Sequence, residues 1–441
     1  MEVAVDGGLP IDPELDFTPR QRRQAIAAAT IGNGLEFYDF VTFAFFAIEI
    51  GHTFFPSQSA FLSLMGSLGT FWAGFLTRPL GAFVLGGFAD RVGRKPAMLL
   101  SMVLMGTGIA LLALTPGYAR IGIAAPIIAV IARMLQGFAL GGEVGSATVY
   151  MMESATTRNR GWTMSWQGAS QGVAASAGAG VGLVLSLFLT NAELSAYGWR
   201  IAMLLGVSIV PFAIWIRNSL PDTHAPEHRQ AAVPGALHTY LRPVICGFII
   251  IASGTIGTYI FNYMTTYGQN TLHLSATVSQ GGEFANNAIG VISVMSGGAL
   301  SDRIGRRPVQ VWSQLAFAAC IVPCFLWLTH SRDAVSFIGA NLLMSAVGSF
   351  MSGATYAAIS ESVPRAVRSR TFALVYSLPV MIFGGSTQLV VTWLLHVTGS
   401  SMSIAWYLTV VTLIGASAMW AMRESAPVRI GKSGGAAKAF A

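Results

Sequence analysis

The sequence contains little charge for its length. Asp, Glu, Lys and Arg make up only 10% of its 441 residues, whereas soluble domains carry about 25%. Hydrophobic residues reach 53%, and the mean hydropathy is +0.60. Because a fold surrounded by water cannot hide that much apolar surface, we expect the chain to lie in a lipid bilayer.

Cysteine is also scarce, which bears on metal binding. Cys320 and Cys324 are one helical turn apart but lack the further ligands of a metal site. With Cys246 they lie in apolar stretches, so we predict that all three pack in the core and bind no metal.

The net charge is +7, but the basic residues are scattered through short loops and form no basic face, which argues against a nucleic-acid partner. Residues 1–19 contain no apolar core of a signal peptide.

Long apolar runs are what the sequence has in abundance. A membrane-spanning helix needs about 20 apolar residues, and several of the runs are rich in the small residues that allow close helix packing in lipid. We therefore predict an all-α membrane protein with twelve transmembrane helices. The runs are 25–50, 61–85, 97–115, 122–152, 162–190, 200–217, 243–267, 279–300, 309–328, 335–358, 371–396 and 403–422.

The basic residues predict how the chain is oriented and divided. Arg and Lys concentrate in alternate connections, with 21 of the 26 on one side, and positive loops remain in the cytoplasm. Both termini are therefore expected to be cytoplasmic, in a bacterial inner membrane. The predicted layout is a tail at 1–24, a six-helix bundle at 25–217, a cytoplasmic loop at 218–242, a second six-helix bundle at 243–422 and a tail at 423–441.

One charged phrase occurs twice, at 86–96 and at 297–308, each between the second and third helix of its half. Parallel repeats of this kind occur in transporters that rock two bundles around a central site. The glycines would permit close backbone approach, and each Asp could accept hydrogen bonds from a neighbouring helix N-terminus. We predict a gating role. The matched positions are Gly86 and Gly298, Asp90 and Asp302, Arg91 and Arg303, Gly93 and Gly305, Arg94 and Arg306, Lys95 and Arg307, and Pro96 and Pro308.

This phrase resembles the signature loop of the major facilitator superfamily, and "RMLQG" at 133–137 resembles its helix 4 motif. "GNGLEFYDF" at 32–40, "GFLTRPLGA" at 74–82, "LQGFALGGEVG" at 135–145 and "IFGGSTQ" at 382–388 resemble the metabolite–proton symporter branch. "TPGYARIGIAAP" at 115–126, "SWQGASQ" at 165–171 and "TTYGQNTLHLSA" at 265–276 are most similar to citrate and tricarballylate symporters.

The resemblance implies two pseudo-symmetric six-helix bundles and no enzyme activity. It implies proton-coupled import of a small organic acid, a di- or tricarboxylate such as citrate, by alternating access, with the proton as coupling ion and no cofactor. Gln269 stands where that subgroup tends to have a basic residue, which leaves mono- and dicarboxylates open. The alternatives are a zwitterionic osmolyte such as proline or betaine, a shikimate-like metabolite and, less favoured, drug efflux. No obligate protein partner is inferred.

Three carboxylates are candidates for proton coupling, because ionisable groups inside a membrane are costly and usually functional. Glu36 and Asp39 lie near the middle of the first helix, three residues apart. Glu143 lies in the fourth helix. Each could instead be a permanent structural partner of an arginine or a brace within the bundle.

Two arginines and several amides are candidates for substrate binding. Arg133, in the fourth helix, could hold a carboxylate with two parallel hydrogen bonds or pair with a carboxylate of the first helix. Arg78 precedes Pro79 and could bind substrate, act in gating, or extend to the inner surface. The polar candidates, for which interhelical hydrogen bonding is the alternative, are Asn33, Gln136, Gln167, Gln171, Asn262 and Tyr263; Tyr356 and Tyr376 are weaker ones.

Overall fold

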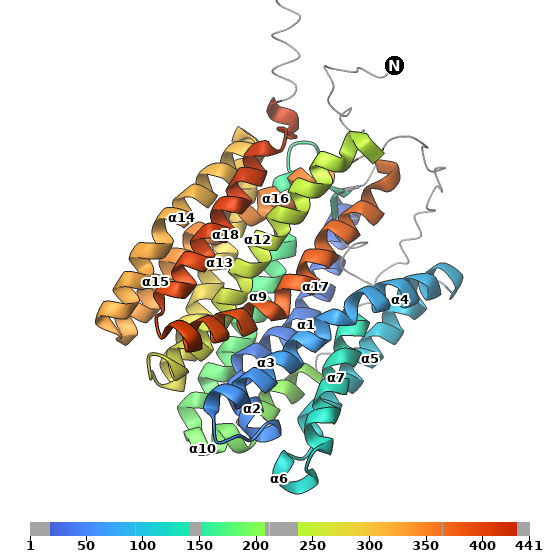
Figure 1. The fold of residues 1–441 in the computed structure, drawn as a ribbon. Coiled ribbons are helices and arrows are strands. Elements are labelled where there is room, and N and C mark those ends of the chain that lie inside the picture. Colours follow the sequence, from blue (N-terminus) through green and yellow to red (C-terminus); the bar gives the residue numbers. More distant parts are fainter. Residues whose placement is uncertain are drawn as a thin grey trace, which may run out of the picture.

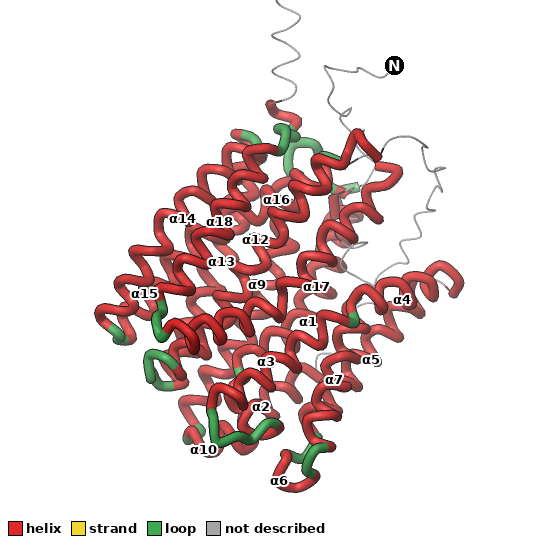
Figure 2. Tube along the Cα trace, viewed as in Figure 1, coloured by secondary structure: helices red, strands yellow, loops and turns green. Residues whose placement is uncertain are grey.

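The computed structural model describes residues 18–92, 94–141, 148, 151–152, 154–207, 211, 237–363 and 365–429. Within these ranges the chain is helical apart from short connections (Figures 1 and 2). The predicted runs coincide with helices wherever they are described. The run at 200–217 is described as far as residue 207, with one residue beyond it.

The first half of the chain contributes helices that alternate in direction. Leu194–Gly198 forms one turn of π-helix. The helices are α1 (Pro19–Phe45), α2 (Ala47–Phe54), α3 (Ala60–Leu76), α4 (Arg78–Val92), α5 (Arg94–Leu114), α6 (Tyr118–Ile121), α7 (Ala124–Leu140), α9 (Arg160–Phe188) and α10 (Asn191–Glu193).

The second half is built in the same way from longer helices. A turn of 3₁₀-helix at Ser349–Met351 joins two of them, α15 and α16, into one span. Asp333 caps α15 by accepting a hydrogen bond from the Ser336 amide, which lowers the pKa of its carboxyl. The helices are α12 (Leu237–Asn270), α13 (Ala276–Ile304), α14 (Arg306–Ser331), α15 (Ala334–Gly348), α16 (Ser352–Glu361), α17 (Arg365–Thr398) and α18 (Met402–Ala421).

Three predicted spans are interrupted, which the hydrophobic runs did not indicate. The first breaks at Phe46, the second at Thr77, and the tenth changes pitch at Ser349–Met351. The break at Thr77 comes two residues before Pro79, whose ring cannot continue the hydrogen bonds of the preceding turn. It places Arg78 at the start of a new helix.

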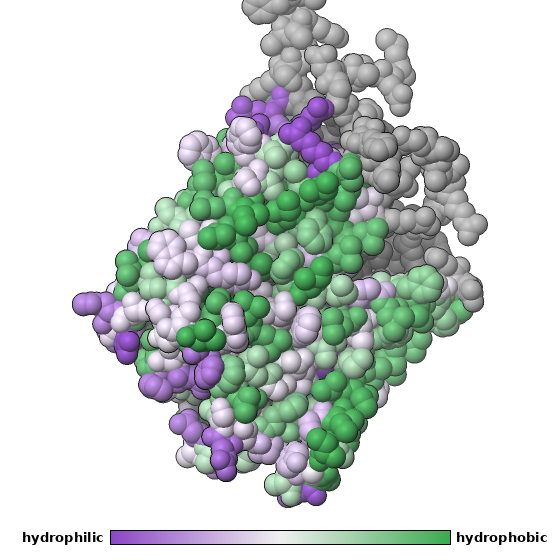
Figure 3. Space-filling model, viewed as in Figure 1, coloured by the Kyte–Doolittle hydropathy of each residue, from purple (hydrophilic) through white to green (hydrophobic). Residues whose placement is uncertain are grey.

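The outer surface suits a bilayer. Within the described ranges, seven helical segments are long and apolar enough to cross a membrane. Figure 3 shows apolar side chains over the flanks of the molecule, with hydrophilic groups gathered towards its two ends. The chain is therefore a multi-pass membrane protein, as the composition predicts.

The two halves meet along two helix pairs. α9 packs along α13, and α3 packs along α17. Glycine makes both contacts close: a Cβ on Gly298 would lie 2.6 Å from the Gly161 carbonyl oxygen, and one on Gly385 would lie 2.4 Å from the Trp72 Cα.

Candidate functional site

A buried ion pair joins the first and fourth spans. Arg133 of α7 is fully buried, Asp39 of α1 is 1% exposed, and their Nη1 and Oδ2 atoms lie 3.3 Å apart. Gln136, one turn along α7, also accepts a hydrogen bond from the Arg133 Nη1. One carboxylate oxygen of Asp39 and the Nε and Nη2 atoms of Arg133 have no partner among the described residues. The pair thus retains hydrogen-bonding capacity inside the protein.

Arg78 is a second buried cation close to this pair. It is 7% exposed, and its Nε and Nη2 atoms have no partner in the described part of the chain. The Tyr259 hydroxyl of α12 lies near its guanidinium group. No carboxylate among the described residues pairs with Arg78, which distinguishes it from Arg133.

The Phe40 ring lies against both guanidinium groups. The Cζ atoms of Arg78 and Arg133 are each 4.4 Å from its centroid, so the two carbons cannot be more than twice that distance apart. Phe75 contacts Arg78 at 4.4 Å, and Phe43 contacts Arg133 at 4.5 Å. Cation–π contact stabilises a desolvated guanidinium by about 2 kcal/mol, less than a full counter-ion would contribute.

Aromatic and amide groups of the other helices complete the surroundings of Arg78. Tyr259 packs edge-on against Phe75, with ring centroids 5.3 Å apart. Tyr376 of α17 is 7% exposed, and Gln171 of α9 lies near its hydroxyl. The arrangement therefore combines cations of the first half with tyrosines of the second.

Three of the remaining polar candidates, Asn33, Gln167 and Tyr263, hydrogen-bond to protein groups. Asn33 donates to the Ser170 hydroxyl over 2.7 Å and receives a hydrogen bond of 3.1 Å from the Gln167 amide, so these side chains join α1 to α9. The Tyr263 hydroxyl accepts from Thr392 over 3.0 Å. Asn262 is buried on α12. All lie in the spans where the sequence predicted them, but the Asn33–Gln167 pair lies within the first half.

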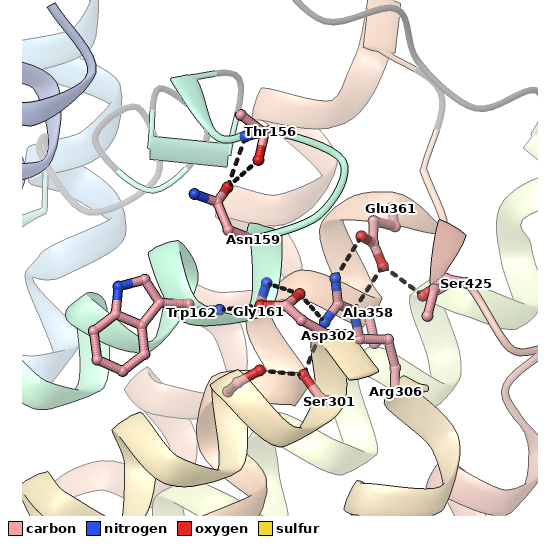
Figure 4. Close-up of polar contacts among 12 residues, drawn as sticks. Thr156, Asn159, Gly161, Trp162, Ser301, Asp302, Arg306, Ala358, Glu361 and Ser425 are labelled. Atoms are coloured by element: carbon pink, nitrogen blue, oxygen red, sulfur yellow. Dashed lines mark hydrogen bonds and ion pairs between the residues drawn. The ribbon is translucent and has the colours of Figure 1, made fainter. Parts of the chain in front are cut away.

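The second copy of the repeated phrase forms a polar cluster between the halves (Figure 4). Asp302 accepts hydrogen bonds of 2.8 Å from the amides of Gly161 and Trp162, at the start of α9. This is the contact that the sequence predicts for it, and the helix N-terminus favours its negative charge. Arg306 donates to Asp302 over 2.7 Å and makes a two-pronged pair with Glu361 at 3.2 and 3.1 Å. We call these five residues the Asp302 cluster.

The chain end beyond α18 also bonds to this cluster. Glu424 accepts from the amides of Arg306 and Arg307, and Ser425 donates to Glu361. Gly305 has a φ of +108°, and a Cβ there would lie 2.7 Å from the Glu424 carboxylate.

Among the other candidates of the repeated phrase, Arg303 is exposed. Several candidates have side-chain surroundings outside the described residues: Glu36, Gly86, Asp90, Arg91, Gly93, Arg94 and Glu143.

Sequence reasoning missed several buried groups. Phe40 carried no signal beyond its place in an apolar run. Glu49 of α2 is 4% exposed and Glu283 of α13 is 1% exposed, and both follow the rule for intramembrane carboxylates that selected Asp39. Glu361 could have been found as an acidic residue directly after the tenth predicted span, 335–358.

Comparison with known proteins identifies relatives along almost the whole length. The family model described as Major Facilitator Superfamily matches residues 29–296. The "Citrate-proton symporter" of Salmonella typhi is 38% identical over 402 residues, covering 89% of this chain and 92% of the relative. The "Alpha-ketoglutarate permease" of Escherichia coli (strain K12) is 32% identical, covering 90% and 92%.

More distant relatives and solved structures extend the comparison. The "Proline/betaine transporter" of Salmonella typhimurium is 29% identical, covering 92% of this chain and 84% of the relative. The crystal structure of a D-xylose-proton symporter superimposes with a TM-score of 0.75 at 16% identity, covering 92% of this chain and 99% of that one. This likeness concerns the fold alone.

Proposed function

Because the chain belongs to the major facilitator superfamily, we propose that it imports a small organic acid with two or three carboxylates, such as citrate, together with protons. The sequence-based predictions of the family, of its twelve-helix fold and of proton-coupled transport are confirmed by the family match and the citrate-proton symporters at 38% identity. The relatives are transporters and not enzymes.

Arg78, for which the described residues offer no carboxylate partner, is the observation that carries this proposal. Arginine stays charged at any physiological pH, so it cannot escape the cost of burial by losing its proton. A buried charge without a partner costs several kcal/mol. A substrate carboxylate would supply the missing acceptors at Nε and Nη2 with two parallel hydrogen bonds. Transport of an organic anion explains why the cation is kept in the membrane.

The Asp39–Arg133 pair would couple the substrate to the proton. Protonation of Asp39 removes the charge that holds Arg133, which leaves a second guanidinium available to an anion. Both guanidinium groups contact Phe40, so one molecule with two carboxylates could reach both. Binding of the proton to Asp39 would therefore favour binding of the anion, and binding of the anion would favour binding of the proton.

The Asp302 cluster would close one end of the pathway. It joins α9 of the first half to α13 and α16 of the second, and rocking of the halves would separate these groups. By the positive-inside rule we assign this end and both termini to the cytoplasm of a bacterial inner membrane. In the alternating-access cycle the cluster would be intact when the inner side is closed.

Ligand-dependent thermal stabilisation of the purified protein tests the anion site. We expect citrate, α-ketoglutarate or succinate to raise the Tm of the wild type in proportion to ln(1 + [L]/Kd). Arg78→Gln should make the increase smaller at each ligand concentration, as expected for a 10- to 100-fold higher Kd. Stabilisation by proline or betaine instead, with none by the carboxylates, would favour the osmolyte alternative suggested by the relatives at 29% identity.

A further inference from the structure

Glu283 is a buried carboxylate that the proposed mechanism leaves unused. It lies on α13 and is 1% exposed. At 1.5 Å per residue it is about 10 Å along the helix from Ala276, well inside the bundle. Its Oε1 atom accepts a hydrogen bond of 2.8 Å from Asn287, one turn further along.

No cation offsets Glu283 among the described residues. α15 has no ionisable side chain, and the only one on α9 is Arg160, at the far end of that helix. On α1, Asp39 is bound to Arg133. The segment of α12 alongside contributes only tyrosines, which are Tyr259 beside Arg78, Tyr263 bonded to Thr392, and Tyr267 packed against Phe325.

The side of α13 that carries Glu283 faces the interior. Ile292 is nine residues further on, which is half a rotation at 3.6 residues per turn, and it is 62% exposed on the outer surface. Of the neighbouring positions, Gly282 lies against Phe337 of α15, and Phe284 lies over Gly180 of α9. Glu283 therefore occupies the inward side, between two neighbouring helices.

We propose that Glu283 is a second proton-binding site, so that each half of the transporter carries one proton per substrate. A carboxylate buried without a counter-ion is far less costly in its neutral form. In that form it can still accept the Asn287 hydrogen bond. Asp39 of the first half and Glu283 of the second would load from the outer side and discharge to the inner side.

The step is a simple protonation. A proton from water on the outer side forms an O–H bond with a carboxylate oxygen of Glu283, and the bond breaks when the proton passes to water on the inner side. Contact with water changes because α13 packs along α9 of the other half, and these helices shift when the halves rock. The inference rests on the proposed proton-coupled transport.

The number of protons carried with each substrate determines the net charge that crosses the membrane. A doubly charged anion carried with two protons transfers no net charge, whereas the same anion carried with one proton transfers a negative charge inward. An inside-negative potential opposes that transfer. Loss of the Glu283 proton site should therefore make an inside-negative membrane potential oppose uptake of a doubly charged anion.

The proton-to-substrate ratio can be measured in proteoliposomes at the gradient that gives zero net flux of radiolabelled citrate, or of α-ketoglutarate if citrate is not accumulated. We expect Glu283→Gln to lower the ratio by one. Glu193→Gln, which changes an exposed carboxylate at the end of α10, should leave it unchanged. An unchanged ratio in Glu283→Gln would overturn the proposal.

Infrared difference spectra of the purified protein between acid and alkaline pH test Glu283 without any substrate. The wild type should lose a protonated-carboxyl band that Glu283→Gln lacks, and Asn287→Leu should shift the pH at which the band disappears. If Glu283→Gln does not fold, the Asn287→Leu shift alone decides. A wild type whose carboxyl band never titrates would contradict the proposal. Failure of every carboxylate to accumulate in the wild type would instead contradict the proposed function.

Discussion

Two arginines of the same charge lie beside one phenyl ring, and only one of them has a carboxylate partner among the described residues. Arg133 has Asp39, whereas Arg78 has tyrosine and phenylalanine. This asymmetry assigns them different tasks. In the proposed mechanism Arg78 would receive the substrate in every state, and Arg133 would become available only when Asp39 is neutral.

Replacing Arg78 should change stability and affinity in opposite directions. Arg78→Gln removes a buried charge that has no counter-ion among the described residues, so the substrate-free protein should have an equal or higher Tm. Affinity for the substrate carboxylate should fall about 10- to 100-fold, because hydrogen bonds to charged groups contribute about 1.5–3 kcal/mol. Thermal shifts and a binding isotherm measure the two effects. A parallel loss of stability would show a structural role instead.

Replacing Asp39 should separate exchange from accumulation. Asp39→Asn cannot take up a proton, so substrate exchange across the membrane should persist while proton-driven accumulation is lost. Counterflow and gradient-driven uptake in the same proteoliposomes measure this difference. Full accumulation by Asp39→Asn would exclude Asp39 as the coupling group.

Phe40 should set the spacing between the guanidinium groups of Arg78 and Arg133. Phe40→Leu removes the ring that both guanidinium groups contact, so affinity should fall more for substrates with two carboxylates than for those with one. Phe45→Leu provides the control, since Phe45 is equally buried in the same core. Equal losses for both substrate types in Phe40→Leu would rule out a role in spacing the cations.

At the scale of helices, glycine and charge act together where α9 meets α13. Gly161 and Gly298 bring the backbones close enough for Asp302 to reach the first amides of α9. A larger residue at either glycine would separate the helices before those hydrogen bonds could form. The repeated phrase therefore encodes a contact between helices as well as a positive loop.

Asp302→Asn should weaken this contact without altering the binding site. It removes a charged acceptor of two helix amides and the ion pair to Arg306, so the inner end should open more readily. We expect the transport rate to fall more than substrate affinity. Uptake rates and thermal-shift Kd values distinguish the two. Equal losses of rate and affinity would contradict a gating role.

Much of the helical framework could be predicted from sequence because apolar runs and positive loops follow directly from the cost of polar groups in lipid. The breaks at Phe46 and Ser349–Met351 could not, because no residue there forbids a helix. Arg133 and Asp39 could be named as candidates, but their pairing and the role of Phe40 depend on how helices rotate against each other. Glu283 meets the same rule for intramembrane carboxylates that selected Asp39, so the sequence alone is sufficient to make it a candidate.

At the scale of the molecule, the two halves contribute unlike groups to one site. The first half supplies both arginines and Asp39, and the second supplies Tyr259 and Tyr376. Rocking about the α9–α13 and α3–α17 pairs would move these two sets relative to each other. Substrate binding and a change of access are thus linked by geometry.

Uptake by the wild type in proteoliposomes under an imposed inward proton gradient tests the central claim most directly. The panel runs from acetate through succinate and α-ketoglutarate to citrate and tricarballylate, with proline and betaine as comparison. We predict that a di- or tricarboxylate accumulates and that a protonophore abolishes its accumulation. Accumulation of proline or betaine alone, or carboxylate uptake that ignores the protonophore, would contradict proton-coupled transport of an organic acid.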